Sequence, residues 1–410
     1  MPSFRKTAVL LTIGSELLKG STLNTNARFL GERLLAAGFR LKEQIACDDV
    51  ISEIKTCLAR ALKSADLVIL TGGLGPTPDD VTREAVAAYF KKPLILSQVQ
   101  WRRINRLYQS LDRTMPASVR QEALYPRSAR QLINRYGIAL GFCLTAGKKL
   151  VVVLPGVPRE LENLMDTQVL PLLKRTFKGP APKHKLILKT FGLSEPSVME
   201  KLGADFFDEP FEFGIYPHPG EVTVRIFAES SAAITRLRRK ALKRLESFIY
   251  STRDESMAQA LGECLRAKGH WLAAAESCTG GQLAAEMTRA PGASRYFRGG
   301  LTVYDNGLKN RLRVTAQMLR RNGAVSLPVA EQLARQIRKF AHADWGIGIT
   351  GIAGPGGGSR RKPAGLVFIG VCGPAGFRHV ERFQFWGTRE QIQRRAVMKA
   401  LELLWRALTR

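Results

Sequence analysis

Apolar runs alternate with amphipathic stretches along the first third of the chain. The run 7–14 (TAVLLTIG) is typical of a buried strand, and the stretch 24–38 has the apolar spacing of a helix that ends at Gly38. A strand over 40–49, an amphipathic helix over 50–65 and a buried strand over 66–73 are expected next. Strands that alternate with helices favour a parallel, doubly wound α/β sheet.

The pattern changes after one more strand, turn and helix over 148–165. Residues 183–250 follow a polar connection, and their order of strand, helix, strand and basic helix predicts a small α+β unit. A second α/β part begins near Asp254, with strands expected at 271–277, 299–306, 344–351 and 365–373. The chain is therefore expected to form two α/β domains, 1–175 and 257–410, joined by a middle domain at 183–250.

Composition agrees with this division and restricts the cellular setting. A length of 410 residues is too great for one ordinary core. No run approaches 18 uncharged apolar residues, so we expect no membrane span, and the first apolar run lacks the cleavage site of a signal peptide. The six cysteines form no CxxC pair and the five histidines form no HxxxH motif, so we expect no structural zinc and a cytoplasmic protein with reduced thiols.

The net charge of +28 raises nucleic acid as a possible partner. The excess of Lys and Arg is spread over both outer thirds, in helical runs such as WRRINR and RLRRKALKR, which usually form solvated faces. We therefore expect anionic small molecules, rather than nucleic acid, as ligands.

A glycine-rich turn follows the strand expected at 66–70. Gly72, Gly73 and Gly75 would end that strand at the carboxyl edge of the sheet, where doubly wound folds bind ligands and backbone N–H groups can approach phosphate. Asp79 and Asp80 could hold a divalent cation that bridges phosphates. An ordinary strand, turn and helix with an Asp N-cap explains the same residues.

A second group of polar residues follows the apolar stretch 271–275. The sequence ESCTGG then leads into a helix, whose N-terminus would attract an anion, although a plain Ser or Thr N-cap is the alternative. Asp305-Asn306-Gly307 is a turn sequence that would fold Lys309 back beside Tyr304. A neutral lysine can serve as a general base for a serine, here Ser294, whereas a surface lysine beside a core tyrosine is the alternative.

The first part of the chain resembles the molybdopterin-binding-like domain that opens the CinA family, in GSELLKGSTLNTNARFLGERLLAAG, TGGLGPTPDDVTREAVA and LPGVPRELENLM. The resemblance implies a metal-dependent ADP-ribose pyrophosphatase, with ADP-ribose as substrate and a divalent metal ion as cofactor. It places the metal at Asp79 and Asp80. It implies a nucleotide site at Gly14, Ser15, Glu16, Asn24, Asn26, Thr71, Gly72, Gly73, Gly75 and Thr77. Where the family has Ala-Pro-Gly, this chain has Ala139-Leu140-Gly141, so we expect a reshaped loop there.

The middle segment resembles the KH-type insert of the same family. A nucleic-acid-binding KH domain uses a GXXG loop, and residues 183–250 contain none. Their net charge is only +2, so we interpret the insert as a spacer or an interface.

Residues 257–410 resemble the CinA C-terminal domain, the nicotinamide mononucleotide deamidase module also known as PncC, in AESCTGG, PGASRYFRGGLTVYDNGLK, GITGIAGPGGGSRRKPAGLVFIGV and FWGTREQIQRRAV. The resemblance implies hydrolysis of nicotinamide mononucleotide without a cofactor, and a homodimer. It implies Ser294, Tyr304 and Lys309 as catalytic residues, with Ser277 as the rival nucleophile. Substrate-binding positions are implied at Ser277, Cys278, Thr279, Gly280, Gly281, Asn306, Thr350 and Arg389.

Two other functions are compatible with parts of the sequence. A molybdopterin-binding protein would account for the first domain and leave 257–410 without a role. A competence-associated role in DNA uptake would use the positive charge, although the charge is dispersed and the GXXG loop is missing.

Overall fold

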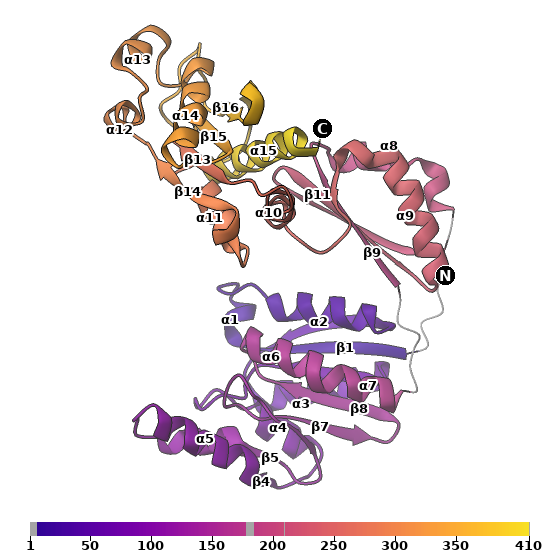
Figure 1. Cartoon of the computed structure of the whole chain (residues 1–410). Helices are drawn as coiled ribbons and strands as arrows, with labels where there is room; N and C mark the ends of the chain where they lie inside the picture. The colour runs from indigo at the N-terminus through magenta and orange to yellow at the C-terminus, as the bar shows by residue number, and fades with distance from the viewer. Residues whose placement is uncertain (1–5, 178–183, 209, 410) are drawn as a thin grey trace. The chain divides into compact units, whose positions relative to one another are not determined.

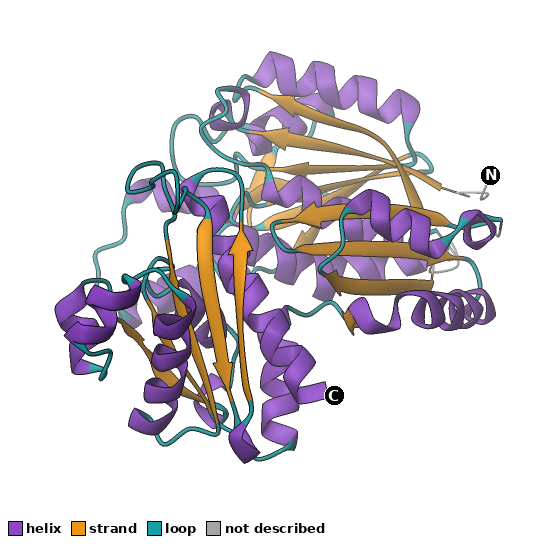
Figure 2. Ribbon diagram, turned by 90° about the horizontal axis from the view of Figure 1, so that it is seen from above, coloured by secondary structure: helices purple, strands orange, loops and turns teal. Residues whose placement is uncertain are grey.

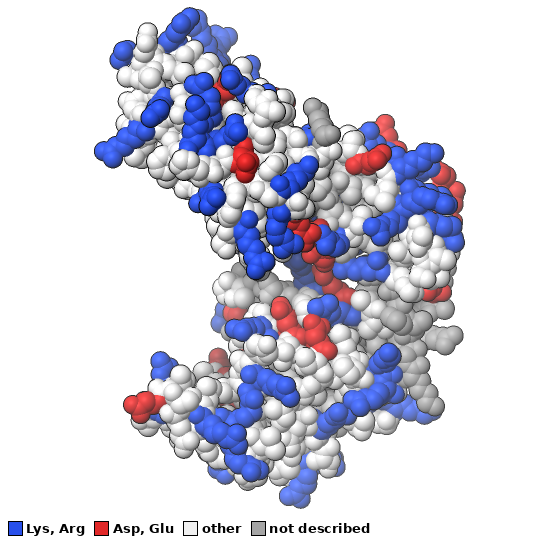
Figure 3. Space-filling model, in the orientation of Figure 1, with Lys and Arg blue, Asp and Glu red and all other residues white. Residues whose placement is uncertain are grey.

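The computed structural model describes residues 6–177, 184–208 and 210–409 (Figure 1). Contacts divide the chain into two compact units, Met1–His184 with Phe227–Ser231, and Lys185–Ile226 with Ala232–Arg410. Helices of both units cover the faces of twisted sheets (Figure 2). Lys and Arg side chains are scattered over the visible surface of each unit rather than gathered in one stripe (Figure 3). Across the described ranges, no helix combines the length and the apolar character that a membrane crossing needs.

The first unit contains a six-stranded sheet in the order β2-β1-β3-β8-β7-β6. Strands β2, β1, β3 and β8 run parallel, and β7 and β6 are antiparallel to their neighbours. The expected parallel sheet is therefore confirmed, with an antiparallel extension at one edge. Its strands are β1 (Lys6–Ile13), β2 (Phe39–Cys47), β3 (Leu67–Thr71), β6 (Arg130–Leu132), β7 (Gly141–Ala146) and β8 (Lys149–Leu154), and a separate pair is formed by β4 (Leu94–Leu96) and β5 (Leu124–Pro126).

Alternation along β1 builds a core on each face of this sheet. Val9 and Leu11 pack with residues of α3 and α4, whereas Ala8 and Leu10 pack with residues of α2, α6 and α7. All four side chains are fully buried, as expected for a strand covered by helices on both sides. The helices are α1 (Ser15–Leu18), α2 (Thr25–Ala36), α3 (Ile51–Ser64), α4 (Thr82–Tyr89), α5 (Gln98–Ser110), η1 (Ala117–Ala123), α6 (Pro158–Leu164), η2 (Met165–Val169) and α7 (Leu170–Thr176).

The middle insert is a four-stranded sheet in the order β10-β11-β9-β12 with helices packed against it. Leu188, Val224 and Leu237 lie in its own small core, so the expected α+β unit is confirmed. Its elements are β9 (His184–Phe191), α8 (Glu195–Leu202), η3 (Ala204–Phe207), β10 (Glu212–His218), β11 (Glu221–Ala228), α9 (Ser231–Leu245), η4 (Glu246–Phe248) and β12 (Ile249–Ser251).

The C-terminal domain has a five-stranded sheet in the order β14-β13-β15-β16-β17, in which β14, β13 and β15 are parallel. Helices α10, α11 and α15 supply the core on one face, and α14 supplies the core on the other. The strands are β13 (Leu272–Glu276), β14 (Phe297–Thr302), β15 (Trp345–Gly351), β16 (Leu366–Cys372) and β17 (Arg378–Gln384). The helices are α10 (Met257–Ala267), α11 (Gln282–Arg289), η5 (Ala293–Arg295), α12 (Asn306–Arg311), α13 (Ala316–Asn322), α14 (Leu327–Phe340), η6 (Pro374–Gly376) and α15 (Arg389–Thr409).

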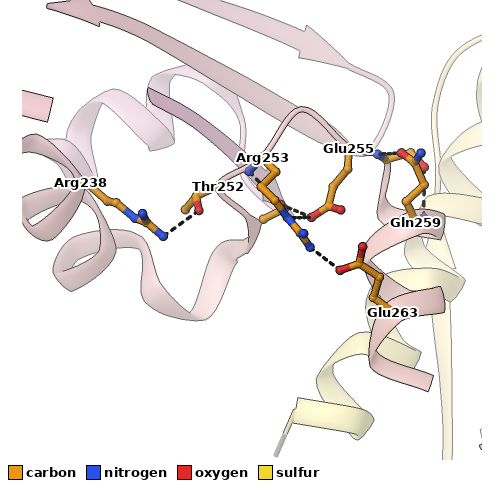
Figure 4. A network of polar contacts seen from close by, with 8 residues as sticks. Arg238, Thr252, Arg253, Glu255, Gln259 and Glu263 are labelled. Atoms are coloured by element: carbon orange, nitrogen blue, oxygen red, sulfur yellow. Dashed lines mark hydrogen bonds and ion pairs between the residues drawn. The ribbon is translucent and has the colours of Figure 1, made fainter. Parts of the chain in front are cut away.

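The insert and the C-terminal domain share an interface along the last turns of α15. The Arg406 guanidinium lies 4.8 Å from the ring centre of Phe191, and Tyr250 packs edge-on against Trp405. Near the connection, Arg253 pairs with Glu263 of α10 and with Glu255 at 3.2 Å (Figure 4). These contacts support the interpretation of the insert as an interface element.

Candidate functional site

A cavity of about 500 Å³ lies at the carboxyl ends of β13, β14 and β15. The chain proceeds from β13 to β14 on one side and reaches β15 on the other, so the cavity occupies the point where strand order reverses. Ligands of open α/β sheets bind at such points. The walls are formed by Ser277, Cys278, Tyr304, Asp305, Asn306, Lys309, Ala324, Val325, Thr350, Gly351, Ile352, Ala353, Gly354, Gly356, Gly357 and Arg389.

Ser277 is the first residue after β13 and borders this cavity. Its N–H donates to the carbonyl of Ile349 at 3.0 Å, and its own carbonyl accepts from Gly280 at 3.1 Å. Within the described part of the chain, the N–H groups of Cys278 and Thr279 have no hydrogen-bond partner in another residue. A serine hydroxyl therefore lies in a fixed turn, and of the two N–H groups the one of Cys278 belongs to a residue of the cavity wall.

Cys278 is the neighbouring candidate nucleophile, and its burial argues against that role. Burial raises the pKa of the Cys278 thiol to about 12, so the thiol stays protonated at neutral pH. The thiolate is the nucleophilic form of cysteine, and reactive cysteines have lowered pKa values. Cys278 therefore forms part of the wall, and Ser277 remains the candidate nucleophile of this turn.

The N-terminus of α11 is occupied by Glu276 and does not provide the anion site expected from the sequence. One carboxylate oxygen accepts from the N–H groups of Gly281 at 3.2 Å and Leu283 at 3.0 Å, and the other accepts from Ala284 at 2.9 Å. A buried carboxylate at this position complements the helix dipole and would repel a substrate phosphate. The expectation that the helix N-terminus binds an anion is therefore wrong, whereas Ser277 as a substrate-binding residue stays a prediction.

Lys309 is buried on α12, and the tyrosine holds it through the main chain. Its Nζ donates to the carbonyl oxygens of Tyr304 at 2.8 Å and Asp305 at 3.4 Å. Burial lowers the pKa of Lys309, although the Asp305 carboxylate opposes the shift. The expected approach of Lys309 to Tyr304 is confirmed, but Asp305 caps a helix here instead of closing a simple turn. The Tyr304 hydroxyl accepts from Arg389 at 2.9 Å.

Ser294 lies at the amino ends of the parallel strands and does not border the cavity, which lies at their carboxyl ends. Phe297 begins β14 and pairs with Leu272, the first residue of β13, whereas Ser277 follows the last residue of β13. Five strand residues at about 3.3 Å each separate the two ends of β13 by roughly 17 Å. The expectation that Ser294 approaches the Tyr304–Lys309 pair is therefore overturned by the direction of β14.

The remaining predicted residues of this site divide into two groups. Asn306 and Thr350 border the cavity, and the Thr350 hydroxyl donates to Ala324 at 2.8 Å. Arg389 donates to the Gly354 carbonyl at 2.8 Å. Thr279, Gly280 and Gly281 lie in the turn behind the wall. Sequence reasoning missed Gln393, whose side chain donates to the Cys278 carbonyl at 2.8 Å, because its position four residues after Arg389 carries no signal until α15 is placed beside the turn.

A second cavity of about 430 Å³ lies in the first unit, at the carboxyl ends of β1, β3 and β8. Its walls include ten of the residues predicted for nucleotide and metal: Gly14, Glu16, Asn24, Asn26, Thr71, Gly72, Gly73, Gly75, Asp79 and Asp80. Ser15 and Thr77 are not part of the walls. Instead, the Ser15 N–H donates to Asp49 at 2.8 Å, and the Thr77 hydroxyl donates to Asp80 at 2.5 Å.

Carboxylates that sequence reasoning did not select also line the second cavity. Asp49 does so, and its pKa is raised by burial and by the negative charges of Glu16 and Asp79, although the Ser15 N–H opposes the shift. Glu122 and Glu160 are the other two. They were missed because they follow the glycine turn by 40 residues or more in the sequence and are brought to it only by the fold.

The carboxylates of this cavity are the donors that a metal ion would use. Among the described residues, no three His, Cys, Asp or Glu side chains are grouped as ligands of one ion. Mg²⁺ usually takes one or two carboxylates together with substrate phosphates. Carboxylates beside a glycine turn fit such a shared ion, which Asp79 and Asp80 would hold together with the substrate phosphates.

Leu140, which departs from the family pattern, is fully buried and does not border the cavity. Its N–H donates to the carbonyl of Glu122 at 2.9 Å, a bond that a proline cannot make. The neighbouring Ala139 is part of the wall.

Family comparisons match three consecutive segments. Residues 9–175 match the "Probable molybdopterin binding domain", 185–251 match the "Damage-inducible protein CinA KH domain", and 254–408 match the "CinA C-terminal domain".

Relatives match along nearly the whole chain. A protein of Moorella thermoacetica is 39% identical over 96% of this chain and 97% of its own length. A CinA-like protein of Cyanothece is 37% identical over 98% of this chain and 99% of its own length. Among solved structures, a CinA protein of unknown function from Thermoplasma acidophilum is 33% identical, covers 42% of this chain and 99% of its own, and has a TM-score of 0.38.

Proposed function

Because the chain belongs to the CinA family, we propose that its C-terminal domain hydrolyses the carboxamide of nicotinamide mononucleotide to nicotinic acid mononucleotide and ammonia. One observation carries this proposal. Ser277 and the buried Lys309 border one cavity together with Cys278, whose N–H group donates to no other described residue. A nucleophile, a base and oxyanion donors are the groups that amide hydrolysis requires.

Ser277 would attack the carboxamide carbon while neutral Lys309 takes the hydroxyl proton. The carbonyl becomes an oxyanion, and the N–H group of Cys278, a residue of the cavity wall, would donate to it. When the C–N bond breaks, Lys309 returns the proton to the nitrogen, which leaves as ammonia. Water then adds to the nicotinoyl ester with Lys309 as base again, and the acid and free Ser277 are released.

Arg389 is the cationic group best placed for the anionic part of the substrate. It is exposed at the cavity wall, and its guanidinium is oriented by Gly354 and Tyr304. A guanidinium fixed in this way suits the bidentate binding of a phosphate. Because Glu276 already occupies the N-terminus of α11, we assign the phosphate to the Arg389 side of the cavity.

The test is ammonia release from nicotinamide mononucleotide by the purified full-length protein, with the Ser277→Ala variant as a matched control. Turnover by the natural chain and none by the variant would support the deamidase. Equal background release by both proteins would overturn it. Nicotinic acid mononucleotide must appear in the same amount as ammonia.

For the first unit we propose a second activity, metal-dependent cleavage of the pyrophosphate of ADP-ribose. The observation in its favour is the glycine turn at the carboxyl edge of β3, which borders the same cavity as Asp79 and Asp80. A divalent cation held there would neutralise phosphate charge during hydrolysis. AMP release that depends on added Mg²⁺ or Mn²⁺ and stops with chelator would support this activity. Denatured protein that fluoresces as a pterin would instead favour a molybdopterin ligand.

A further inference from the structure

Glu122 is a buried carboxylate at the second cavity, and its hydrogen bonding is incomplete. The residue is only 3% exposed, it belongs to η1, and it borders the cavity. Its Oε1 is buried and has no hydrogen-bond partner in the part of the chain that the structure describes. A buried carboxylate oxygen without a hydrogen-bond partner lowers the free energy of unfolding, and such groups are common at functional sites.

The backbone around Glu122 is fixed against the glycine turn. The side chain of Gln121, the preceding residue, donates to the Gly75 carbonyl at 3.3 Å. The Glu122 carbonyl accepts from Leu140 at 2.9 Å. The backbone of Glu122 is thus held beside the turn that we assign to the pyrophosphate.

Arg83 provides positive charge close to Glu122 without satisfying it. The Arg83 side chain is fully buried, and its Nη2 donates to the Leu74 carbonyl at 2.6 Å. Its Nη1 forms an ion pair with Glu84 at 3.5 Å, and neither Nε nor Nη1 makes a hydrogen bond among the described residues, so no donor from Arg83 completes Glu122. Arg83 therefore acts on Glu122 through space and leaves the carboxylate oxygen free to accept a proton.

Burial and three charged groups determine the charge state of Glu122. Burial raises its pKa to about 7, Arg83 opposes the shift, and the carboxylates of Glu160 and Asp80 add to it. A base with a pKa near the working pH combines an available acceptor with sufficient basicity. Glu160 also borders the cavity but already accepts from the side-chain amide of Asn134 at 2.5 Å.

We propose that Glu122 is the general base of the first unit and accepts the proton of the water that attacks the pyrophosphate. The proposal rests on the pyrophosphatase activity proposed above. The water oxygen forms a bond to one phosphorus, and its proton passes to Glu122. The bond from that phosphorus to the bridging oxygen breaks, and its electron pair leaves with the departing phosphate. The proton of Glu122 then returns to solvent or to the product.

The test compares the full-length protein with its Glu122→Gln and Glu160→Gln variants, measuring AMP release from ADP-ribose with Mg²⁺ between pH 5 and pH 9. Glu122→Gln keeps the shape and removes the base, so kcat should fall about 10²–10⁴-fold and its rise with pH should disappear. Glu160→Gln should keep the rise with pH. ADP-ribose binding by calorimetry should survive in Glu122→Gln, and ammonia release from nicotinamide mononucleotide should be unchanged.

Stability gives a readout that does not depend on turnover. Because the pKa of Glu122 is raised on folding, its ionisation disfavours the folded state above pH 7, whereas below pH 4 it is protonated in both states. Glu122→Gln should therefore stabilise the first unit at pH 8 more than at pH 4. Unchanged kcat and pH profile in Glu122→Gln would overturn the assignment while leaving the pyrophosphatase intact. If the natural chain releases no AMP, both the pyrophosphatase and the role of Glu122 are excluded.

Discussion

Lys309 Nζ donates to the main-chain carbonyl oxygen of Tyr304 at 2.8 Å, while the Tyr304 hydroxyl is turned toward Arg389. The side-chain nitrogen of Lys309 therefore contacts the main chain of Tyr304 and not its side chain. Because the acceptor is a main-chain oxygen, the orientation of the Lys309 side chain does not depend on which side chain is present at position 304. The tyrosine and the lysine thus have separable roles, and mutations can distinguish them.

Lys309→Met should remove nearly all ammonia release, because the variant keeps the length of the side chain and loses the base. We expect kcat to fall about 10²–10⁴-fold while substrate binding survives. Steady-state kinetics with nicotinamide mononucleotide gives kcat and KM separately. A variant with normal kcat and a raised KM would identify Lys309 as a phosphate ligand instead.

The deamidase should also show the lowered pKa of Lys309 in its pH profile. Burial moves that pKa below the ordinary 10.5, and only the neutral amine can accept the serine proton. The logarithm of kcat/KM should rise with pH, as the lysine loses its proton, and level off at a pH below 10.5. A profile that falls as the solution becomes more alkaline would exclude Lys309 as the base.

Tyr304→Phe should have a much smaller effect than Lys309→Met. It removes the hydroxyl that accepts from Arg389 and leaves the carbonyl that holds the lysine. Loss of one hydrogen bond to a charged group costs about 1.5–3 kcal/mol at most, and here it should appear as a raised KM, because Arg389 loses its orientation. A kcat loss equal to that of Lys309→Met would mean that the hydroxyl takes part in proton transfer.

The sequence predicted the architecture well because its strands and turns carry strong local signals. Fully apolar runs such as 67–70 and 272–275 identified the central strands, and Gly72 and Gly280 marked the turns that follow two of them. Both cavities lie at those turns, as the position of ligands in doubly wound sheets requires.

The two serines show why local signals did not suffice. Ser294 is ten residues before Tyr304, and that interval includes the whole of β14. The strand takes the chain from the amino ends of the parallel strands to their carboxyl ends. Glu276 lies within the strand expected at 271–277, and no local signal shows that its side chain returns to cap α11. Glu122 reaches its cavity only through tertiary contacts, which no spacing in the sequence encodes.

Asp80→Asn should abolish AMP release from ADP-ribose and leave deamidation unchanged. Asp80 accepts from the N–H and hydroxyl of Thr77, so the amide can keep part of this local structure while losing the charge that a cation needs. Paired assays of AMP and ammonia on one preparation check both halves. Undiminished AMP release would remove Asp80 from the metal site, and loss of both activities would indicate a folding defect.

Ser277→Ala should eliminate ammonia release, whereas Ser294→Ala should retain it within a factor of a few. Only Ser277 borders the cavity with Lys309, and a nucleophile must come within hydrogen-bond reach of its base during the reaction. Ser294 is exposed on η5 at the amino ends of the parallel strands, so its substitution removes a surface hydroxyl. Acid-quenched enzyme should carry a nicotinoyl adduct on the peptide that contains Ser277, and mass spectrometry would locate it. An adduct on Ser294, with loss of turnover in Ser294→Ala, would require a second copy of the chain to bring that serine to the cavity. The same spectra would show an adduct on Cys278 if the thiol, despite its raised pKa, were the attacking group.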